Sequence, residues 1–237
     1  MQLTKRLQAV ADFVTPGSRV ADVGCDHAYI SIYLARNKIS PSIIAMDINK
    51  GPLERAKSNI ERYGCERVIE TRLSDGLEKL KPGEADSIVV AGMGGPLMVK
   101  ILSEGRESML AARELILQPQ SEIYKVRQFL KEQQFAITAE NMVIDEGKYY
   151  FIMKAIRRDI CSEPEAYDLC KKEHFHFGRL LLENRHPVLK SYLLWDLEIC
   201  ESILKALEDE TSEKALERRQ QVGERIELIR CGLEYYK

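Results

Sequence analysis

The chain has 237 residues, of which 45% are hydrophobic and 30% are charged, as in an ordinary folded protein. This composition excludes a chain that is disordered over most of its length. Lysine and arginine number 35 against 37 acidic residues, so no overall positive charge indicates a nucleic-acid partner. The longest uncharged run, residues 87–99, is shorter than the ~20 residues that a membrane span requires.

The cysteine content predicts a reducing compartment. The six cysteines include no CxxC pair, and Asp12 interrupts the apolar run that a signal peptide would need. We therefore expect reduced thiols in a cytoplasmic protein with no membrane attachment. Cys170 and His174 are one helical turn apart, but Cys161 lacks the tight paired spacing of zinc ligands. No metal site is therefore expected.

Five short apolar runs alternate with helical patterns in the first part of the chain. The runs that predict strands are residues 19–23, 42–46, 67–72, 87–91 and 115–117. Residues 52–63 show the clearest helical periodicity between them. Near-continuous apolar strands separated by helices indicate parallel βαβ units with both sheet faces covered. The predicted fold class is therefore α/β, with a doubly wound sheet.

Two further β-like runs, residues 136–144 and 149–156, follow a helical pattern at residues 121–133. The turn sequence at residues 145–148 joins them as a hairpin. A parallel sheet that closes with such a hairpin would carry one antiparallel strand at its edge.

The pattern changes near Arg158, and no strand-like run follows Pro164. Apolar residues then recur with heptad spacing in two stretches. These residues are Leu193, Leu197, Cys200, Leu204 and Leu207, followed by Val222, Ile226, Ile229 and Leu233. Thr211 or Ser212 could cap the second helix. We predict an α/β domain over residues 1–158 and a helical coiled-coil domain over residues 159–237, although these helices could instead cover the sheet.

Small and acidic residues follow four of the predicted strands. They are Asp22 near the end of the first with Gly24 after it, Asp47 after the second, Asp75 and Gly76 after the third, and Gly92 and Met93 after the fourth. The carboxyl ends of parallel strands meet at one edge of a sheet, where ligands bind at the topological switch point. The series therefore predicts a ligand site, in which the Asp47 carboxylate can accept hydrogen bonds from ribose hydroxyls.

The first of these turns argues against a dinucleotide. Gly24 fits the first glycine of a dinucleotide-binding turn, but Asp26 and Ala28 occupy the second and third positions. A carboxylate there would repel a pyrophosphate. S-adenosylmethionine carries an ammonium and a carboxylate and has no phosphate, so it tolerates Asp26. S-adenosylmethionine is therefore the predicted cofactor.

The run Asp22-Val-Gly-Cys-Asp-His-Ala-Tyr29, with Ala-Gly-Met-Gly-Gly at 91–95 and Leu-Gln-Pro at 117–119, closely resembles the TrmK family. These are bacterial tRNA methyltransferases that modify N1 of adenine 22. The resemblance covers Leu3 to about Ile156 and extends to the helical C-terminal part. It implies a class I (Rossmann-like) methyltransferase fold with a C-terminal coiled coil. The chain also lacks the Asn/Asp-Pro-Pro-aromatic motif of exocyclic-amine methylases after the fourth strand.

The resemblance implies a cofactor site spread over these strand ends. It places Gly24, Asp26 and His27 around the methionine end, Asp47 on the ribose, Ile48 against the adenine face, Asp75 and Gly76 at the adenine edge, and Gly92 and Met93 beneath the sulfonium, with Asp22 in the same motif. Alternatively, the glycines could only permit turns, Asp47 could cap a helix, and His27 could be a packed histidine.

Methylation at N1 requires no proton removal, because N1 already carries a lone pair, but the product is cationic. A carboxylate against the N6 amino group would stabilise that charge, and an aromatic ring could stack on the base. We assign these roles to Asp26 and Tyr29, although Tyr29 could be a packing residue. The target base would have to be flipped out of its stack.

The predicted RNA partner must be bound by local basic clusters. Candidates are Lys5-Arg6, Arg157-Arg158, and Lys171-Lys172 with Arg179, any of which could be ordinary solvated surface. From Cys161 onward, 16 acidic residues outnumber 12 basic ones, so only one face of the helical part is expected to contact tRNA. The alternatives to a tRNA methyltransferase are a small-molecule methyltransferase and a non-catalytic scaffold on the same fold.

Overall fold

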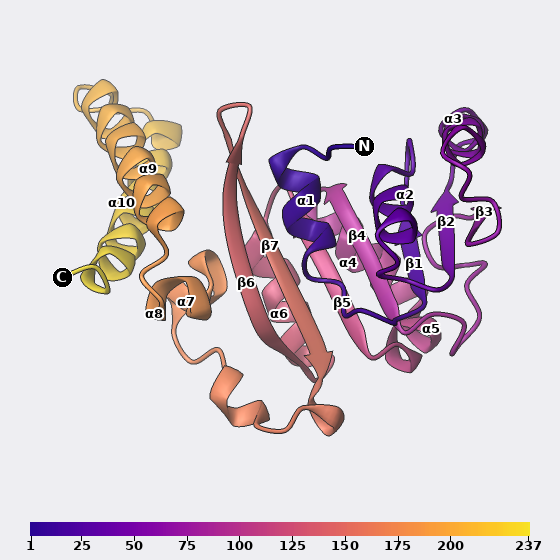
Figure 1. The fold of residues 1–237 in the computed structure, drawn as a ribbon. Coiled ribbons are helices and arrows are strands. Elements are labelled where there is room, and N and C mark those ends of the chain that lie inside the picture. The colour runs from indigo at the N-terminus through magenta and orange to yellow at the C-terminus, as the bar shows by residue number, and fades with distance from the viewer. The chain divides into compact units, whose positions relative to one another are not determined.

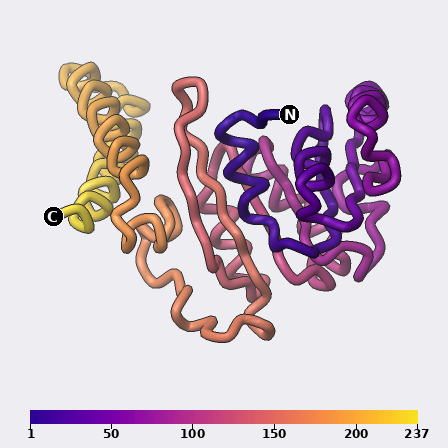
Figure 2. The backbone as a smooth tube through the Cα atoms, viewed as in Figure 1, coloured from indigo at the N-terminus to yellow at the C-terminus, as the bar shows by residue number.

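The computed structural model describes all 237 residues, which form two compact units, Met1–Asp168 and Leu169–Lys237. The first unit contains the sheet and the second is helical (Figure 1). After the sheet, the backbone passes through two short 3-10 helices, η1 (Arg158–Ile160) and η2 (Pro164–Tyr167), before the helical unit begins (Figure 2). The domain boundary predicted after Arg158 falls within the first unit and stays a prediction.

A seven-stranded sheet with the order β3-β2-β1-β4-β5-β7-β6 forms the centre of the first unit. The strands are β1 (Val20–Val23), β2 (Ile43–Asp47), β3 (Ile69–Leu73), β4 (Ser87–Met93), β5 (Glu114–Pro119), β6 (Phe135–Asp145) and β7 (Lys148–Arg157). Strands β1 to β5 are parallel, as predicted. The chain leaves β1 for the β2 side and later returns to β4 on the other side, so the switch point lies between β1 and β4.

The position predicted for the antiparallel strand is wrong. β7 is antiparallel to both β5 and β6, and it lies between them, so β6 occupies the edge. The central residues of β7, Phe151 to Met153, are fully buried, whereas residues 138–141 of β6 are only half-buried. The more apolar strand of the hairpin therefore takes the inner position, where backbone partners are present on both sides.

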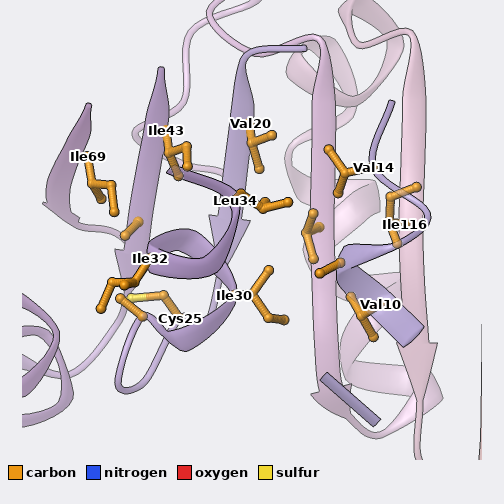
Figure 3. Close-up of a cluster of buried hydrophobic side chains, with 14 of the residues drawn as sticks. Val10, Val14, Val20, Cys25, Ile30, Ile32, Leu34, Ile43, Ile69 and Ile116 are labelled. Carbon is orange, nitrogen blue, oxygen red and sulfur yellow. The ribbon is translucent and has the colours of Figure 1, made fainter. Parts of the chain in front are cut away.

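Helices cover both faces of the sheet. They are α1 (Lys5–Ala11), α2 (Tyr29–Arg36), α3 (Lys50–Arg62), α4 (Gly95–Glu104), α5 (Arg106–Ala111) and α6 (Ile123–Glu132). Figure 1 shows α1 and α2 on one face and α4 and α6 on the other. On the α1 side, Val10, Ile30 and Leu34 are buried in a cluster with strand residues such as Val20 and Ile116 (Figure 3). This packing fixes α1 next to the carboxyl end of the sheet.

The second unit consists of four helices. They are α7 (Lys172–Phe177), α8 (Arg179–Glu183), α9 (Pro187–Ala206) and α10 (Glu213–Glu234). The two long helices pack on each other, with Leu193 and Cys200 of α9 and Ile226 of α10 buried. Ser212 caps α10, as predicted, because its hydroxyl accepts a hydrogen bond from the Ala215 amide at 3.3 Å. No helix of the chain is long and apolar enough to cross a bilayer.

Candidate active site

The turn between β1 and α2 has an unusual backbone. Gly24, Asp26 and Ala28 have φ angles of 72°, 47° and 56°, which lie in the left-handed region that favours glycine. Asp26 and Ala28 occupy the positions of the second and third glycines of a dinucleotide-binding turn, and their backbone has the left-handed conformation that glycines adopt easily. Non-glycine residues in this conformation store strain and concentrate at functional sites.

Gly24 lies at a close approach between two strand ends. A Cβ atom at Gly24 would be 2.2 Å from Cε of Met93, so a side chain cannot be accommodated there without displacing Met93. The backbone amides of Gly24 and Cys25 both donate to the carbonyl oxygen of Met46, at 2.8 and 2.9 Å. These contacts hold the ends of β1, β2 and β4 together at the switch point.

A cavity of about 390 Å³ opens at these strand ends. Six of the predicted site residues line it, namely Asp22, Gly24, Asp26, His27, Tyr29 and Gly92. The structure thus brings together both residues that were assigned to the target base and five of those assigned to the cofactor, since Asp26 has both assignments. Thr4, Arg6 and Leu7 of the N-terminal segment also line the cavity, together with Gln120.

The Asp47 carboxylate is outside the lining but adjoins it. Its Oδ2 accepts a hydrogen bond from the Asp26 amide at 3.3 Å, and its Oδ1 accepts one from the Asn49 amide at 2.9 Å. Each carboxylate oxygen has a second lone pair, so both can still accept from hydroxyl groups. The next residue, Ile48, is 56% exposed, which leaves an apolar side chain free at the end of β2.

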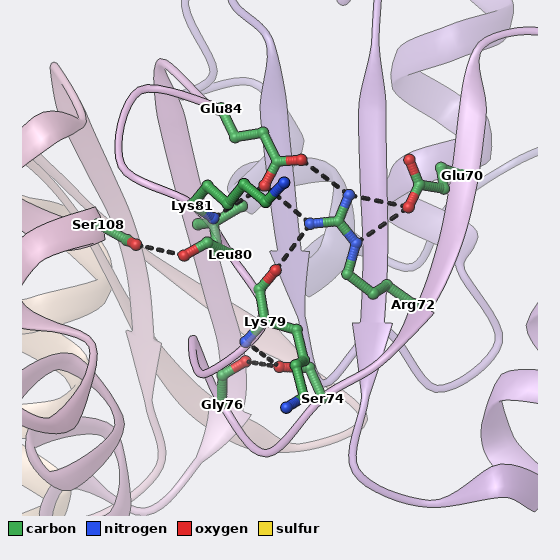
Figure 4. A network of polar contacts seen from close by, with 9 residues as sticks. All are labelled: Glu70, Arg72, Ser74, Gly76, Lys79, Leu80, Lys81, Glu84 and Ser108. Carbon is green, nitrogen blue, oxygen red and sulfur yellow. Dashed lines mark hydrogen bonds and ion pairs between the residues drawn. The ribbon is translucent and has the colours of Figure 1, made fainter.

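Asp75 and Gly76 line a separate cavity of about 230 Å³, and no predicted site residue of the first cavity borders it. A polar network fixes their loop (Figure 4). The Ser74 hydroxyl donates to the Gly76 carbonyl oxygen at 3.0 Å, and Arg72 forms an ion pair with Glu84 at 2.8 Å. The loop stays next to β2, because the Ser74 amide donates to the Asp47 carbonyl oxygen at 2.9 Å.

Asp26, His27 and Tyr29 form the rim of the larger cavity. The rings of His27 and Tyr29 stack with centroids 5.3 Å apart and an interplanar angle of 12°. The Asp26 carboxylate is 60% exposed and lies 3.3 Å from Arg55 of α3 and 3.6 Å from the His27 ring. Asp26 belongs to the turn, since α2 begins at Tyr29. His27 is a partly exposed rim residue and does not pack in the core.

Asp22 is the buried acid of the site. It accepts a hydrogen bond from the Ser31 hydroxyl at 2.6 Å. Burial raises the pKa of Asp22 to about 6, because the charged form loses its hydration, and the Ser31 bond offsets only part of this effect. A cation bound next to Asp22 would favour its ionised form.

The prediction from sequence did not assign Arg6 or Gln120 to the cofactor site. Arg6 was a candidate only for RNA binding, because it lies in an N-terminal helix and not at a strand end. Gln120 directly follows the Leu-Gln-Pro run, which was noted only for its resemblance. Its amide donates from the backbone to the Met93 carbonyl oxygen at 2.8 Å, which places its side chain beside the fourth strand end.

Comparison with known proteins identifies the family. Residues 3–153 match the family described as "Methyltransferase domain". The chain is 32% identical to the Bacillus subtilis tRNA (adenine(22)-N(1))-methyltransferase, covering 99% of this chain and 98% of that protein. This chain belongs to the TrmK family. The sequence resemblance to that family is thereby confirmed.

Solved TrmK structures share the whole fold. The crystal structure of Bacillus subtilis TrmK superposes with a TM-score of 0.87, 32% identity and coverage of 98% of this chain and 99% of that one. Mycoplasma capricolum TrmK in complex with S-adenosyl-homocysteine gives 0.82, 25% identity and full coverage of both chains. Streptococcus pneumoniae Sp1610 in complex with S-adenosyl-L-methionine gives 0.84, 30% identity and coverage of 98% and 100%. The predicted Rossmann-like methyltransferase fold is confirmed.

The predicted cofactor, S-adenosylmethionine, is confirmed for this TrmK chain by its family and by these complexes. The residues of the cavity fit it. The missing side chain at Gly24 lets Met93 approach the turn closely, and the lining combines carboxylates with one guanidinium, as a zwitterionic ligand requires. A pyrophosphate would instead meet Asp22 and Asp26.

We expect cofactor affinity to depend on pH through Asp22. Its ionised form would attract the cofactor's ammonium, and with a pKa of about 6 this form is scarce at low pH. Binding should therefore tighten about tenfold between about pH 5 and about pH 7. Calorimetry over this range measures the effect, and Asp22→Asn should make the profile flat. A wild-type profile without this rise would remove Asp22 from the ammonium site.

We also expect Asp47→Ala to weaken cofactor binding by about tenfold to a hundredfold, because a hydrogen bond to a charged group contributes about 1.5–3 kcal/mol. Asp47→Asn retains one acceptor for the Asp26 or Asn49 amide and should have an intermediate affinity. Calorimetry, together with thermal unfolding to verify the fold, measures both. Unchanged affinity in Asp47→Ala would contradict a role on the ribose.

Proposed function

We propose that this TrmK protein transfers the methyl group of S-adenosylmethionine to N1 of adenine 22 in tRNA. The relative with this named activity matches nearly the full length of the chain, which supports the same substrate. The observation in the structure that carries the proposal is the cavity rim, where the Asp26 carboxylate lies beside the stacked rings of His27 and Tyr29. A tRNA substrate makes the cytoplasm the expected location.

The rim residues suit a flipped adenine. When bound, the cofactor supplies an electrophilic methyl group, which the N1 lone pair attacks in line. Asp26 accepts a hydrogen bond from the N6 amino group, which orients N1 and stabilises the positive charge that develops on the ring. Tyr29, 40% exposed and backed by His27, presents a flat surface on which the base stacks. No residue has to act as a general base.

The remaining predicted cofactor contacts are part of the same proposal. Gly24, His27 and Gly92 surround the methionine end, with Met93 beneath the sulfonium. Asp47 holds the ribose, and Ile48 packs on the adenine. Asp75 and Gly76 would meet the adenine edge from their own cavity, since the β2 and β3 ends are hydrogen-bonded through Ser74. The experiment that tests these roles is cofactor affinity in single variants.

We further propose that the chain is divided functionally into a catalytic domain, residues 1–158, and a coiled-coil domain, residues 159–237. The packing of α9 on α10 and the burial of heptad positions support the second assignment. A small-molecule methyltransferase does not need such a helical pair, whereas a long RNA substrate offers it a contact surface. One face of this domain would bind tRNA.

The experiment that tests the function is methylation of unmodified bulk tRNA with labelled S-adenosylmethionine, followed by nucleoside analysis. We expect label in N1-methyladenosine, and we expect none when a single tRNA transcript carries guanine at position 22. Label in another nucleoside would assign a different RNA site. No label in any nucleoside, despite cofactor binding, would favour a small-molecule substrate or a non-catalytic scaffold.

A further inference from the structure

Two glutamines flank Pro119 at the end of β5, and they differ in their hydrogen bonds. Gln118 is fully buried, its Oε1 accepts from Arg6 at 2.9 Å, and its Nε2 donates to the Pro119 carbonyl oxygen at 3.2 Å. The Gln120 side chain is exposed, lines the larger cavity and forms no hydrogen bond within the protein. Gln118 is thus a structural residue, whereas Gln120 presents an unused donor and an unused acceptor to the cavity.

The backbone of two neighbouring strands fixes the position of Gln120. The register of β4 against β5 shifts between Ala91 and Met93, where Gly92 has a φ angle of 81°. Such irregularities redirect side chains and are common beside active sites. The Gln120 amide then donates to the Met93 carbonyl oxygen at 2.8 Å, and a Cβ atom at Gly92 would be 3.9 Å from Nε2 of Gln120. The side chain of Gln120 therefore lies against the end of β4.

The strand order places Gln120 on the acceptor side of the site. The adenosine part of the cofactor is assigned to Asp47 after β2 and to Asp75 after β3, and the sulfonium to the end of β4. In the sheet, β5 follows β4 on the side opposite to β1, β2 and β3. A side chain at the end of β5 therefore lies beyond the methyl end of the cofactor. An acceptor base must enter from there for an in-line transfer.

The amide of a glutamine matches one edge of adenine. Adenine presents a donor, the N6 amino group, next to an acceptor, N7, and a glutamine can bond to both at once. Guanine presents the acceptor O6 in place of the N6 donor, and pyrimidines have no counterpart of N7. Hydrogen bonds along this edge leave N1 free to face the methyl group.

We propose that Gln120 recognises the N6 and N7 edge of the target adenine and so contributes to the choice of base. Its Nε2 donates to N7, and its Oε1 accepts one hydrogen of the N6 amino group. The second hydrogen of that group is available to Asp26, which follows β1 and enters the cavity from the other side of β4. This inference rests on the proposed function, because it requires adenine as the methyl acceptor.

The test is a cycle of kcat/KM values for methylation. It combines wild type and Gln120→Ala with two tRNA transcripts, which carry adenine or 7-deazaadenine at position 22. The analogue keeps N1 and the N6 amino group but lacks the N7 acceptor. We expect the preference for adenine over the analogue to be about tenfold larger in wild type than in Gln120→Ala. Other effects of the analogue on N1 or on the tRNA cancel, because both proteins receive the same two transcripts.

Gln128→Ala is the matched control, because Gln128 is an exposed glutamine of α6 outside the cavity. It should keep the wild-type preference, and Gln120→Ala should keep the wild-type cofactor affinity and thermal stability. An equal preference in wild type and Gln120→Ala would overturn this inference alone. If that result came with weaker cofactor binding, Gln120 would belong to the cofactor site. No N1-methyladenosine from wild type on the adenine transcript would instead overturn the proposed function, and this inference with it.

Discussion

Asp26→Ala should lower the methylation rate constant by about a hundredfold to a thousandfold at saturating cofactor, which is the typical effect of losing one electrostatic stabiliser. The carboxylate is exposed at the cavity rim, so it is accessible to a base that enters from outside. It is paired there with Arg55 of α3 at 3.3 Å. The N6 amino group must take the place of this exposed partner, which is a weak competitor because solvent screens the pair. Single-turnover kinetics with tRNA measure the effect.

The backbone of Asp26 offers a sharper control than alanine. With φ at 47°, glycine at this position relieves strain while removing the carboxylate. Asp26→Gly should therefore be at least as stable as wild type in thermal unfolding and as slow as Asp26→Ala. Asp26→Asn should fall between, and Tyr29→Phe should be milder than Tyr29→Ala if stacking matters more than the hydroxyl. A wild-type rate in Asp26→Gly would reduce Asp26 to a turn residue.

The strand pattern could be predicted from sequence because each parallel strand is a short apolar run that ends in a glycine or an acid. The order of the two hairpin strands, β6 and β7, in the sheet could not be predicted from sequence. The alternation in residues 136–144 and 149–156 indicates two paired strands, but the choice of the inner strand depends on how much apolar surface each buries against β5 and the helices. The burial of Phe151 to Met153 makes this choice, and it is a tertiary effect.

The candidate site shows the same limit. Asp22, Gly24 and Gly92 could be located because strand ends converge by topology. Arg6 converges through packing of α1 on the sheet, and it reaches the cavity through contacts with Gln118 and Tyr150, which are more than a hundred residues away. Sequence spacing contains no information about such contacts. Asp75 was assigned to the same site because it also follows a parallel strand. The loop after β3 nevertheless places it at a separate cavity.

Removal of the helical unit should separate cofactor binding from tRNA binding. A chain that ends at Asp168 keeps the whole sheet unit, including the ion pair between Arg158 and Asp168 at 2.7 Å, which a chain ending at Arg158 would lose. Every residue that lines the cofactor cavity lies before residue 121. The shortened chain should therefore bind S-adenosylmethionine within about twofold of the full chain, as calorimetry and thermal unfolding would show.

The affinity of the chain that ends at Asp168 for tRNA should fall by at least about tenfold, and its rate of methylation at subsaturating tRNA should fall in proportion. The salt dependence gives an independent measure, because each lost phosphate contact lowers the log–log slope of affinity against salt by about 0.7–0.9. Acidic residues outnumber basic ones from Cys161 onward, so only a local basic face can contact the phosphates. The slope should therefore change by an amount that corresponds to a few phosphate contacts. A shortened chain that methylates tRNA at the full rate, with an unchanged slope, would show that the helices serve another partner.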